Sequence, residues 1–381
     1  MRQSIENWNA NREVTFACAF DYLVELLHHA LDRDEEKGLQ MWSAIFDYLR
    51  ERWQIADCRR ILRELKGFRI SQELRPIALI LVRAAEGMLE TQLGHWDEAI
   101  ACYRQALELV RNIGDRVSEA QLLSNLGNIY YLAGHLSKAR KSYEQALVIY
   151  QEQGHKRGEA LVLTNLGNVY RDSGRLNEAK ACYEKALVLH CEPSQEDIVA
   201  VALVNLGSVL QLQGKRNEAE AAYKKALKLF AQIGDLHGQA QVLGNLGTLY
   251  LNNGQLEGAL ECFMQDLSIN QQLGDYLSQA QTLNNLAIAY HRLGRLEESF
   301  RCYEHSLILR RELGDQHGEL AALINLCEMQ QELGNLAMAH NYLRKAYALA
   351  QKLGDNEQLT RIERLEAMLS KCYRSDSEAG R

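Results

Sequence analysis

The sequence predicts an all-α protein, an α-solenoid (superhelix) of stacked helix pairs, and two observations carry this prediction. The first is that only two prolines, Pro76 and Pro193, occur in 381 residues, against 26 glycines. Proline is the strongest breaker of helix interiors, so its scarcity favours helices throughout. The second is a strict 40-residue period, which is the sequence signature of a repeat architecture.

Three series of residues mark the period. The first is Asn-Leu followed by a small residue, at 125–127, 165–167, 205–207, 245–247, 285–287 and 325–327. The second is a glycine that recurs every 40 residues, at Gly94, Gly134, Gly174, Gly214, Gly254, Gly294 and Gly334. The third is a Gly-Asp pair at most junctions between units, beginning at Gly114, Gly234, Gly274, Gly314 and Gly354. Residues 75–354 therefore divide into seven units of 40 residues, of which the first, 75–114, is degenerate.

Each unit is expected to fold into two helices. In the unit that begins at Asp115, apolar residues at Leu122, Leu126 and Ile129 have helical spacing, and Gly134 suits a left-handed C-terminal cap. Aspartate is a good N-cap, so the Gly-Asp pair ends one helix and begins the next. Each helix is expected to have roughly 16–18 residues, about 25 Å at 1.5 Å per residue.

The two ends of the chain depart from the repeat. Residues 1–74 predict three amphipathic helices, near 12–32, 36–51 and 53–67. Two interpretations of them remain open: an N-terminal cap with one eroded repeat, or a separate helical bundle with its own partner. Residues 355–372 carry apolar side chains on one helical face and are expected to cap the exposed end of the stack. Residues 373–381 are expected to form a disordered tail.

Composition argues against several classes of function. The net charge of −7 opposes binding to nucleic acid, because phosphate contacts need a surplus of Lys and Arg. No apolar run approaches the ~20 residues that span a bilayer, so no membrane partner is expected. The first residues lack a signal-peptide core, and the nine cysteines follow no disulfide-rich pattern, which favours a reducing, cytoplasmic location. The sequence leaves the oligomeric state open between monomer and dimer.

No pattern in the sequence is typical of an enzyme, a metal site or a cofactor site. The G-x-x-x-x-G-K-[ST], G-x-S-x-G and H-E-x-x-H motifs are all missing. Cys102, Cys182, Cys262 and Cys302 share one register of the repeat. They should lie one or more units apart along the stack, too far for a disulfide or a shared metal. We therefore expect no catalytic, cofactor-binding or metal-binding residues.

The repeat resembles the tetratricopeptide repeat. That family has Leu-Gly and then an aromatic residue on the first helix, and Ala, an aromatic residue and Ala on the second. The corresponding residues of the unit at 115–154 are Leu126, Gly127, Tyr130, Ala139, Tyr143 and Ala146. The 40-residue length and the order Asn-Leu-Gly-Asn look closest to the branch of kinesin light chains and spindle-orientation adaptors. The resemblance covers residues ~75–354 and implies a right-handed α-solenoid that binds other proteins.

One asparagine recurs on the first helix of every unit after the first. The series is Asn125, Asn165, Asn205, Asn245, Asn285 and Asn325. Asparagine inside a helix is up to ~0.7 kcal/mol worse than alanine, so a repeated asparagine calls for a compensating role. The residue before it varies (Ser124, Thr164 and Val204, for example), which argues against recent duplication as the explanation. Local capping, in which the amide bonds to backbone or to the adjacent repeat, remains the alternative.

The resemblance implies that these asparagines form a ladder on the concave face, which the first helices line in tetratricopeptide proteins. A primary amide is both donor and acceptor and can pair with one peptide group of an extended chain, as in O-GlcNAc transferase and related adaptors. Further expected peptide-binding residues are Gln121, Asn128, Tyr131, Asn168, Arg171, Gln211, Gln241, Asn252, Gln281, His291, Arg292 and Gln331. Only Arg171 and Arg292 are strong cations, so the basic clamp of chaperone-binding relatives and the acidic ligand of spindle-orientation relatives are not indicated.

Asp266 and Ser306 depart from the repeat. They occupy the second small position of the second helix, where the other units have Ala106, Ala146, Ala186, Ala226 and Ala346. A buried carboxylate without a partner is costly. Asp266 is therefore expected either to turn toward solvent or bond locally, or to loosen the stack there as a hinge, and Asp266→Ala is expected to raise the melting temperature.

Taken together, the sequence indicates a non-enzymatic scaffold or adaptor that holds an extended peptide segment of a partner protein. One alternative is a regulatory sensor, in which a peptide bound in the superhelix switches an N-terminal effector bundle. A related alternative is the repeat sensor of a larger signalling ATPase or protease.

Overall fold

The computed structural model describes residues 31, 33–51, 55–67, 69–189 and 196–379. Within these ranges the α-helix is the only regular secondary structure, which confirms the all-α prediction. Two N-terminal helices, α2 (Glu35–Glu51) and α3 (Ile55–Gly67), correspond to the second and third expected there. The helix expected over 12–32 lies outside the described residues, apart from residue 31.

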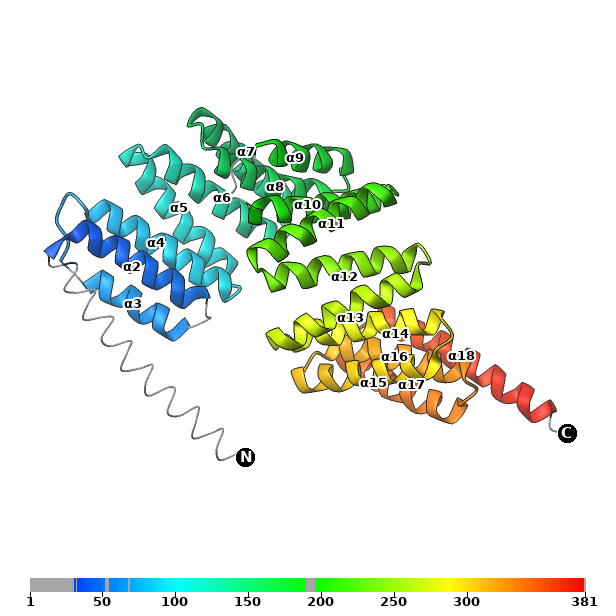
Figure 1. Cartoon of the computed structure of the whole chain (residues 1–381). Helices are drawn as coiled ribbons and strands as arrows, with labels where there is room; N and C mark the ends of the chain where they lie inside the picture. Colours follow the sequence, from blue (N-terminus) through cyan, green and yellow to red (C-terminus); the bar gives the residue numbers. More distant parts are fainter. Residues whose placement is uncertain (1–30, 32, 52–54, 68, 190–195, 380–381) are drawn as a thin grey trace. The chain divides into compact units, whose positions relative to one another are not determined.

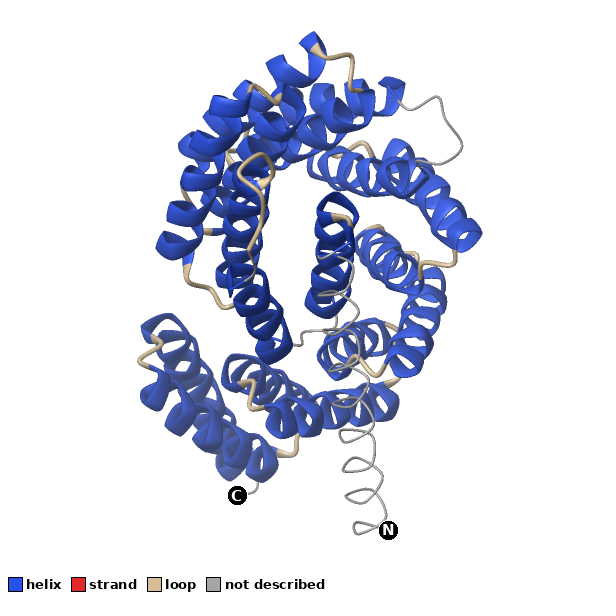
Figure 2. Ribbon diagram, turned by 90° about the vertical axis from the view of Figure 1, so that its left-hand side faces the viewer, coloured by secondary structure: helices blue, strands red, loops and turns tan. Residues whose placement is uncertain are grey.

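From Arg75 onward the helices form pairs that follow the 40-residue period (Figure 1). The first helices of the seven units are α4 (Arg75–Gln92), α6 (Arg116–Leu132), α8 (Lys156–Asp172), α10 (Glu196–Leu212), α12 (Leu236–Asn252), α14 (Tyr276–Arg292) and α16 (Gln316–Glu332). The second helices are α5 (Trp96–Ile113), α7 (Leu136–Glu152), α9 (Leu176–Leu189), α11 (Arg216–Ile233), α13 (Leu256–Leu273), α15 (Leu296–Leu313) and α17 (Leu336–Leu353). Short loops join them, as Figure 2 shows for the described part of the chain.

The junctions between units form as the Gly-Asp pair predicts. Gly114 adopts a left-handed conformation with a φ of 81°, and the Asp115 carboxylate accepts the backbone N–H of Ser118 at 3.1 Å. Where the junction has histidine instead, His155 does the same through its ring, because Nδ1 accepts the N–H of Gly158 at 2.9 Å. Either side chain satisfies a backbone donor at the start of a helix.

The contacts divide the chain into two compact units, Met1–Cys191 and Glu192–Arg381. In each of them, consecutive helices pack against one another. First helices of neighbouring repeats also touch directly: α6 touches α8 in the first unit, and α12 touches both α10 and α14 in the second. Within each compact unit, the first helices that touch therefore form one layer, and the side chains at equivalent positions of these helices lie in that layer.

Glycine and tyrosine account for the close approach of the two helices within a repeat. Gly127 on α6 lies against the ring of Tyr143 on α7, and a Cβ added to Gly127 would lie 2.5 Å from Cε1 of that ring. Tyr143 is only 1% exposed. The pairs Gly167–Tyr183 and Gly207–Tyr223 repeat the contact, as the resemblance implies.

We expect Gly127→Ala to destabilise the protein. The added methyl group must push Tyr143 out of its position, and overpacking of this kind typically costs about 1–3 kcal/mol, more than the helix propensity gained. Gly67→Ala is the matched control, because nothing lies within 4 Å of a Cβ built there. Thermal unfolding followed by circular dichroism measures both; a Gly127→Ala variant as stable as Gly67→Ala would contradict the packing argument.

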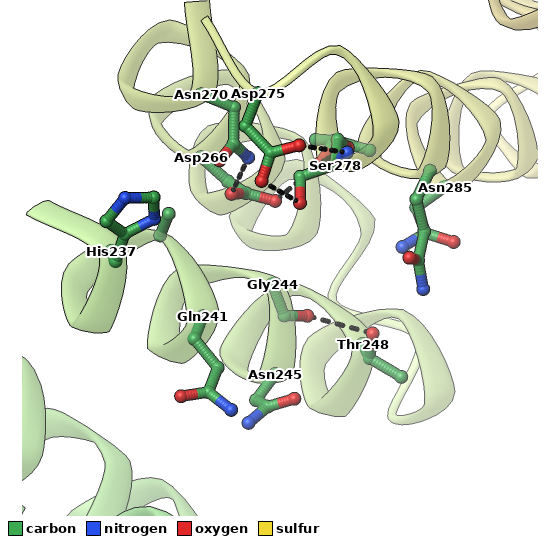
Figure 3. A pocket seen from close by; sticks show the side chains of 13 residues that line it. His237, Gln241, Gly244, Asn245, Thr248, Asp266, Asn270, Asp275, Ser278 and Asn285 are labelled. Atoms are coloured by element: carbon green, nitrogen blue, oxygen red, sulfur yellow. Dashed lines mark hydrogen bonds between the residues drawn. The ribbon is translucent and has the colours of Figure 1, made fainter. Parts of the chain in front are cut away.

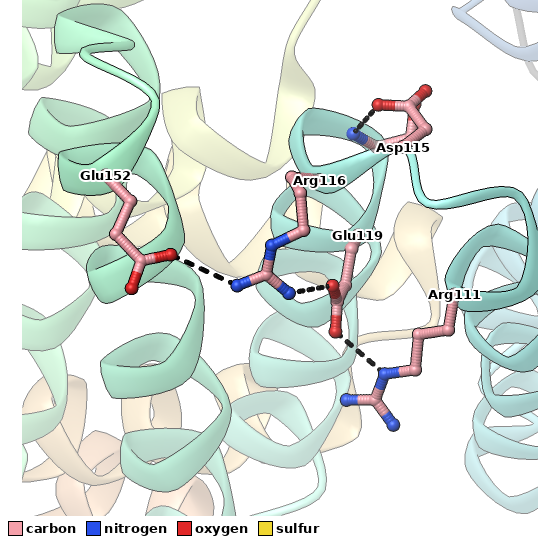
Figure 4. Close-up of polar contacts among 6 residues, drawn as sticks. Arg111, Asp115, Arg116, Glu119 and Glu152 are labelled. Carbon is pink, nitrogen blue, oxygen red and sulfur yellow. Dashed lines mark hydrogen bonds and ion pairs between the residues drawn. The ribbon is translucent and has the colours of Figure 1, made fainter.

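A set of ion pairs ties together three helices of the first compact unit (Figure 4). The buried Glu119 on α6 accepts Nε of Arg111 from α5 at 2.7 Å and also binds Arg116 in its own first turn. Arg116 reaches on to Glu152 on α7 at 3.1 Å. Because the arginines are about half exposed, each pair adds little stability, although together the pairs connect three successive helices.

The last helix is longer than expected. α18 (Asn356–Ala379) runs beyond residue 372, where the predicted capping helix ends, and covers most of the segment predicted as a tail. The physical reason is that no glycine or proline interrupts the sequence before Gly380. Ile362, Leu365 and Leu369 of α18 are buried against the last repeat, so the first part of the helix covers the end of the stack as a cap would. The division at residue 74 between the N-terminal segment and the repeats stays a prediction.

Candidate functional site

The repeated asparagine lies on the solvent-accessible side of each first helix. On α12, Gln241, Asn245, Thr248 and Asn252 are among the accessible residues and are spaced by four, three and four residues, so they form one stripe along the helix. All six asparagines of the series are partly exposed, whereas the leucine that follows each of them is buried. None of these amides is turned into the core.

Two of the six amides are bonded to the preceding repeat. Asn165 donates from Nδ2 to Oδ1 of Asn128 at 3.1 Å, and Asn325 donates from Nδ2 to Oδ1 of Asn284 at 2.9 Å. At these two positions the structure has the local bond that the capping alternative describes.

The other four amides are open to a ligand. Within the part of the chain that the structure describes, the side chains of these four make no hydrogen bond: Asn125, Asn205, Asn245 and Asn285. Three of them, Asn205, Asn245 and Asn285, lie in the second compact unit on helices α10, α12 and α14, where α12 touches the other two.

Several of the other expected binding residues are held by neighbours. Asn128 accepts the hydroxyl of Tyr143 at 2.6 Å, and Asn168 accepts that of Tyr183 at 2.7 Å, so these amides lock the tyrosines that fill the core. Gln211 likewise accepts the hydroxyl of Tyr223, at 3.3 Å. They are structural supports of the exposed stripe, a role that the sequence pattern did not reveal.

The two strong cations of the stripe are also engaged. Arg171 pairs through Nε with its neighbour Asp172 at 2.8 Å, and Asp172 in turn binds the hydroxyl of Tyr131. Arg292 donates to the carbonyl oxygen of Leu251 at 3.0 Å. A third candidate, His291, lies 2.5 Å from a carboxylate oxygen of Glu332. Arg171 and His291 therefore lie beside carboxylates, whereas Arg292 donates to an uncharged carbonyl oxygen.

Four expected residues come together at one pocket. Gln241 and Asn245 on α12, and Gln281 and Asn285 on α14, line a cavity of about 390 Å³. Figure 3 shows the labelled Gln241, Asn245 and Asn285 around the same space, with Asp266 of α13 at its inner side. Two neighbouring repeats thus contribute an equivalent Gln-Asn pair, four residues apart, to a single site.

Asp266 is buried and hydrogen-bonded. It is 6% exposed, and its two carboxylate oxygens each accept one side-chain donor at 2.7 Å, from Asn270 Nδ2 and Thr282 Oγ1. Of the sequence expectations, local bonding holds in part, since Asn270 is on the same helix, but the carboxylate does not turn toward solvent. Desolvation by burial raises the pKa of Asp266 to about 6, although both hydrogen bonds act in the opposite direction.

Ser306, the other departure, is also satisfied. Its hydroxyl is fully buried and donates to the carbonyl oxygen of Ala280 at 2.7 Å. Its role is therefore to join α15 to the first helix of its own repeat.

The cysteine series forms no site in the described residues. Cys102, Cys182, Cys262 and Cys302 are half-buried free thiols, and burial raises the pKa of Cys262 and of Cys302 to about 11. A search of the described residues finds no group of three or more side chains of the metal-binding types. It also finds no described helix that is long and apolar enough to cross a membrane.

Comparison with known proteins adds a family match. A family model described as tetratricopeptide repeat matches residues 78–152, 198–272 and 278–352, and a second model with the same description matches residues 160–190. No curated protein sequence matches significantly.

Solved structures share the fold. BtubC (BKLC) from P. vanneervenii is 25% identical over 57% of this chain and 92% of its own, with a TM-score of 0.54. The apo quorum sensor NprR from B. thuringiensis is 17% identical over 88% of this chain and 99% of its own, with a TM-score of 0.64. A Rap protein complexed with Competence and Sporulation Factor is 16% identical over 84% of this chain and 99% of its own, with a TM-score of 0.53.

Proposed function

Because the chain belongs to the tetratricopeptide repeat family, we propose that it is a non-enzymatic, cytoplasmic scaffold that holds an extended segment of another polypeptide. The contact is made by the asparagine side chains of the first helices, which pair with the main chain of the ligand. The best-supported part of this row is Asn205, Asn245 and Asn285, in the second compact unit.

The observation that carries the proposal is the free hydrogen-bonding capacity of these three amides. They occupy equivalent positions on adjacent helices, are partly exposed, and have no hydrogen-bonding partner within the described residues. A side-chain amide presents two donor hydrogens and one acceptor oxygen, which complement the carbonyl and N–H of a peptide group. A repeated amide therefore suits a ligand whose main chain also repeats.

The flanking residues do not form a basic clamp around these asparagines. Arg171 is paired with Asp172, and Arg292 donates to the carbonyl oxygen of Leu251, while amides and hydroxyls make up most of the polar lining of the pocket beside Asn245 and Asn285. The bonded amides, Asn165 and Asn325, fit the proposal as ends or supports of the row, and they provide a matched control.

A second candidate function, a peptide-responsive sensor, has one observation in its favour. Leu39 and Trp42 of α2 and Ile61 of α3 share a continuous core with Val82 and Leu89 of the first repeat. A conformational change in the first repeat can therefore be transmitted to α2 and α3 through this shared core. If a bound peptide slowed or accelerated hydrogen exchange in α2 and α3, the sensor would be favoured over the passive scaffold.

The proposed function is tested with peptides selected against the protein from a random library. We expect the triple variant Asn205→Ala/Asn245→Ala/Asn285→Ala to bind the selected peptides roughly 100-fold more weakly, since each lost hydrogen bond is worth about 0.5–1.5 kcal/mol. Fluorescence anisotropy measures the affinity, and circular dichroism checks that helicity is unchanged. Asn325→Ala, whose amide is already engaged, should have a smaller effect.

A scan of the ligand separates main-chain from side-chain recognition. N-methylation of single peptide groups of a selected peptide should reduce binding, while alanine at most positions should be tolerated. Equal affinity of the triple variant and the wild-type protein would refute the asparagine row.

A further inference from the structure

One junction between repeats in the second compact unit has three polar side chains where the preceding junction is apolar. Asp266, Asn270 and Thr282 meet there, whereas the preceding junction has Ala226, Phe230 and Val242 at the same three positions. The position of Thr282 is apolar in every other unit: Val82, Leu122, Val162, Ala202, Val242 and Ala322. Three positions thus change character together, and their side chains bond to one another.

A fourth departure leaves space beside this junction. Gly244, one residue before Asn245, stands where other units have Ser124, Thr164, Val204, Asn284 or Ile324. A Cβ built on Gly244 would lie 3.4 Å from Oδ2 of Asp266. Any of the larger side chains would project toward the carboxylate, so the glycine leaves the space in front of it open. Gly244 and Asp266 therefore form one wall of the pocket together.

The pocket is negatively charged. Its lining includes two carboxylates, Asp266 and Asp275, one histidine, His237, and no lysine or arginine. Asp275 is occupied as an N-cap, since it accepts the backbone N–H of Ser278 at 3.0 Å and its hydroxyl at 2.7 Å. The other polar lining groups are the amides of Gln241, Asn245, Asn270, Gln281 and Asn285 and the hydroxyls of Thr248, Ser278 and Thr282.

We propose that this pocket binds the basic side chain of a bound polypeptide, with its guanidinium or ammonium group held against the Asp266 carboxylate. The proposal rests on the proposed function for the origin of that side chain. A carboxylate offers about four acceptor sites, and two are taken by Asn270 and Thr282, so acceptor capacity remains. The surrounding amide oxygens add acceptors suited to the five donors of a guanidinium group.

The choice of aspartate over asparagine at position 266 supports a charged ligand. An asparagine there would accept from Asn270 through its oxygen and donate through its amide to Thr282, whose hydroxyl also lies 2.9 Å from the carbonyl oxygen of Ser278. The hydrogen-bond network therefore does not require a charge. What the carboxylate adds is a negative charge kept away from water, which a cation entering through the open side would compensate.

The test uses two small probes that differ only in charge. Nα-acetyl-arginine methylamide is titrated into the full chain and followed by amide chemical shifts, and the citrulline analogue, of the same shape but uncharged, is the control ligand; a lysine analogue compares ammonium with guanidinium. We expect saturable shifts in α12, α13 and α14 with the arginine probe and at least tenfold weaker binding of the citrulline probe. Equal binding of the two would overturn the proposal.

Two variants separate charge from space. Asp266→Asn removes the charge and keeps the shape, and Gly244→Ser fills the space in front of a retained carboxylate. Both variants should bind the arginine probe at least tenfold more weakly than the wild-type protein does. Unchanged affinity of the Asp266→Asn variant would again overturn the proposal. Glu312→Gln, which removes an exposed carboxylate of the same compact unit away from the pocket lining, should bind the probe normally.

The pH dependence is a further arm of the same experiment. The pKa of Asp266, raised to about 6 by burial, predicts that probe affinity falls about tenfold between pH 7.5 and pH 5. The other titratable groups that line the pocket are His237 and Asp275, and although desolvation acts against it, hydrogen bonds from Ser278 hold the pKa of Asp275 below its usual range. The Asp266→Asn variant isolates the part due to Asp266. If the arginine probe binds as expected but the selected peptides bind the triple asparagine variant as tightly as the wild-type protein, the proposal for the pocket is supported and the proposed function is refuted.

Discussion

At pH 7.5 the Asp266→Asn variant is expected to be more stable than the wild-type protein by about 3 kcal/mol. The pKa of Asp266 rises from its usual 3.8 to about 6, because the folded chain removes the carboxylate from water. A pKa shift of one unit corresponds to 1.36 kcal/mol, so the shift from 3.8 to about 6 amounts to about 3 kcal/mol. This is the free energy by which ionisation of the buried carboxylate destabilises the folded state. Asparagine keeps the hydrogen bonds to Asn270 and Thr282 without a charge.

The direction of the pH effect follows from the raised pKa. Below pH 3.8 the group is protonated in both states and costs nothing; as the pH rises toward 6, the unfolded chain releases the proton first, so the wild-type protein loses stability. The advantage of Asp266→Asn should therefore be complete above pH 6 to 7 and disappear near pH 4. Urea unfolding of both proteins across this range measures it. A difference that does not change with pH would contradict the assignment to Asp266.

Asparagine is a cleaner replacement than the alanine that sequence reasoning suggested. Asp266→Ala also removes the charge, but it leaves the buried amide of Asn270 without its acceptor. An unsatisfied buried donor costs about 1–3 kcal/mol, which offsets much of the gain. The expected rise in melting temperature is therefore smaller for Asp266→Ala than for Asp266→Asn.

The largest loss of stability is expected from placing the same carboxylate one repeat earlier. Ala226 is fully buried, and its neighbours at the positions of Asn270 and Thr282 are Phe230 and Val242. Ala226→Asp therefore buries a charge with no donor at those two positions, which costs about 3–5 kcal/mol. Thermal unfolding should show a drop larger than that of Gly127→Ala.

A mutant cycle checks that partners, rather than position, decide this cost. In the background Phe230→Asn/Val242→Thr, which supplies the donors of the natural site, adding Ala226→Asp should cost less than it does alone. Similar costs in both backgrounds would mean that Asn270 and Thr282 contribute little to accommodating Asp266.

The helices and their junctions were predictable because they follow from local rules that the chain repeats. Asp115 caps the helix that begins after it, and Gly127 meets Tyr143, because N-capping and close helix packing depend on residues at fixed short separations. The extent of α18 was less predictable, because no stop signal marks residue 372 and the sequence lost its period there.

The candidate site was only partly predictable from the sequence. The recurrence of Asn245 and Asn285 marked the row, and their partial exposure agrees with it. Which amides are engaged was not predictable, because the bond from Asn165 to Asn128 crosses between repeats and depends on the spacing of α6 and α8. The sequence pattern singled out Asp266 but not its hydrogen-bonding partner Thr282, because Thr282 lies at a different position of the repeat, on the first helix of the next unit.

The left-handed glycines at the ends of the second helices have an evolutionary consequence. Gly234 and Gly274 have φ values of 73° and 69°, and each is followed by an aspartate that caps the next helix. A chain lacking residues 235–274 would join Gly234 to Asp275 and form the same Gly-Asp junction between two helices. Unequal recombination that deletes or adds one whole repeat can thus shorten or lengthen the protein without a new loop. Loss of residues 235–274 would remove Asp266, and with it the negatively charged pocket, and would shorten the series of asparagines by one member.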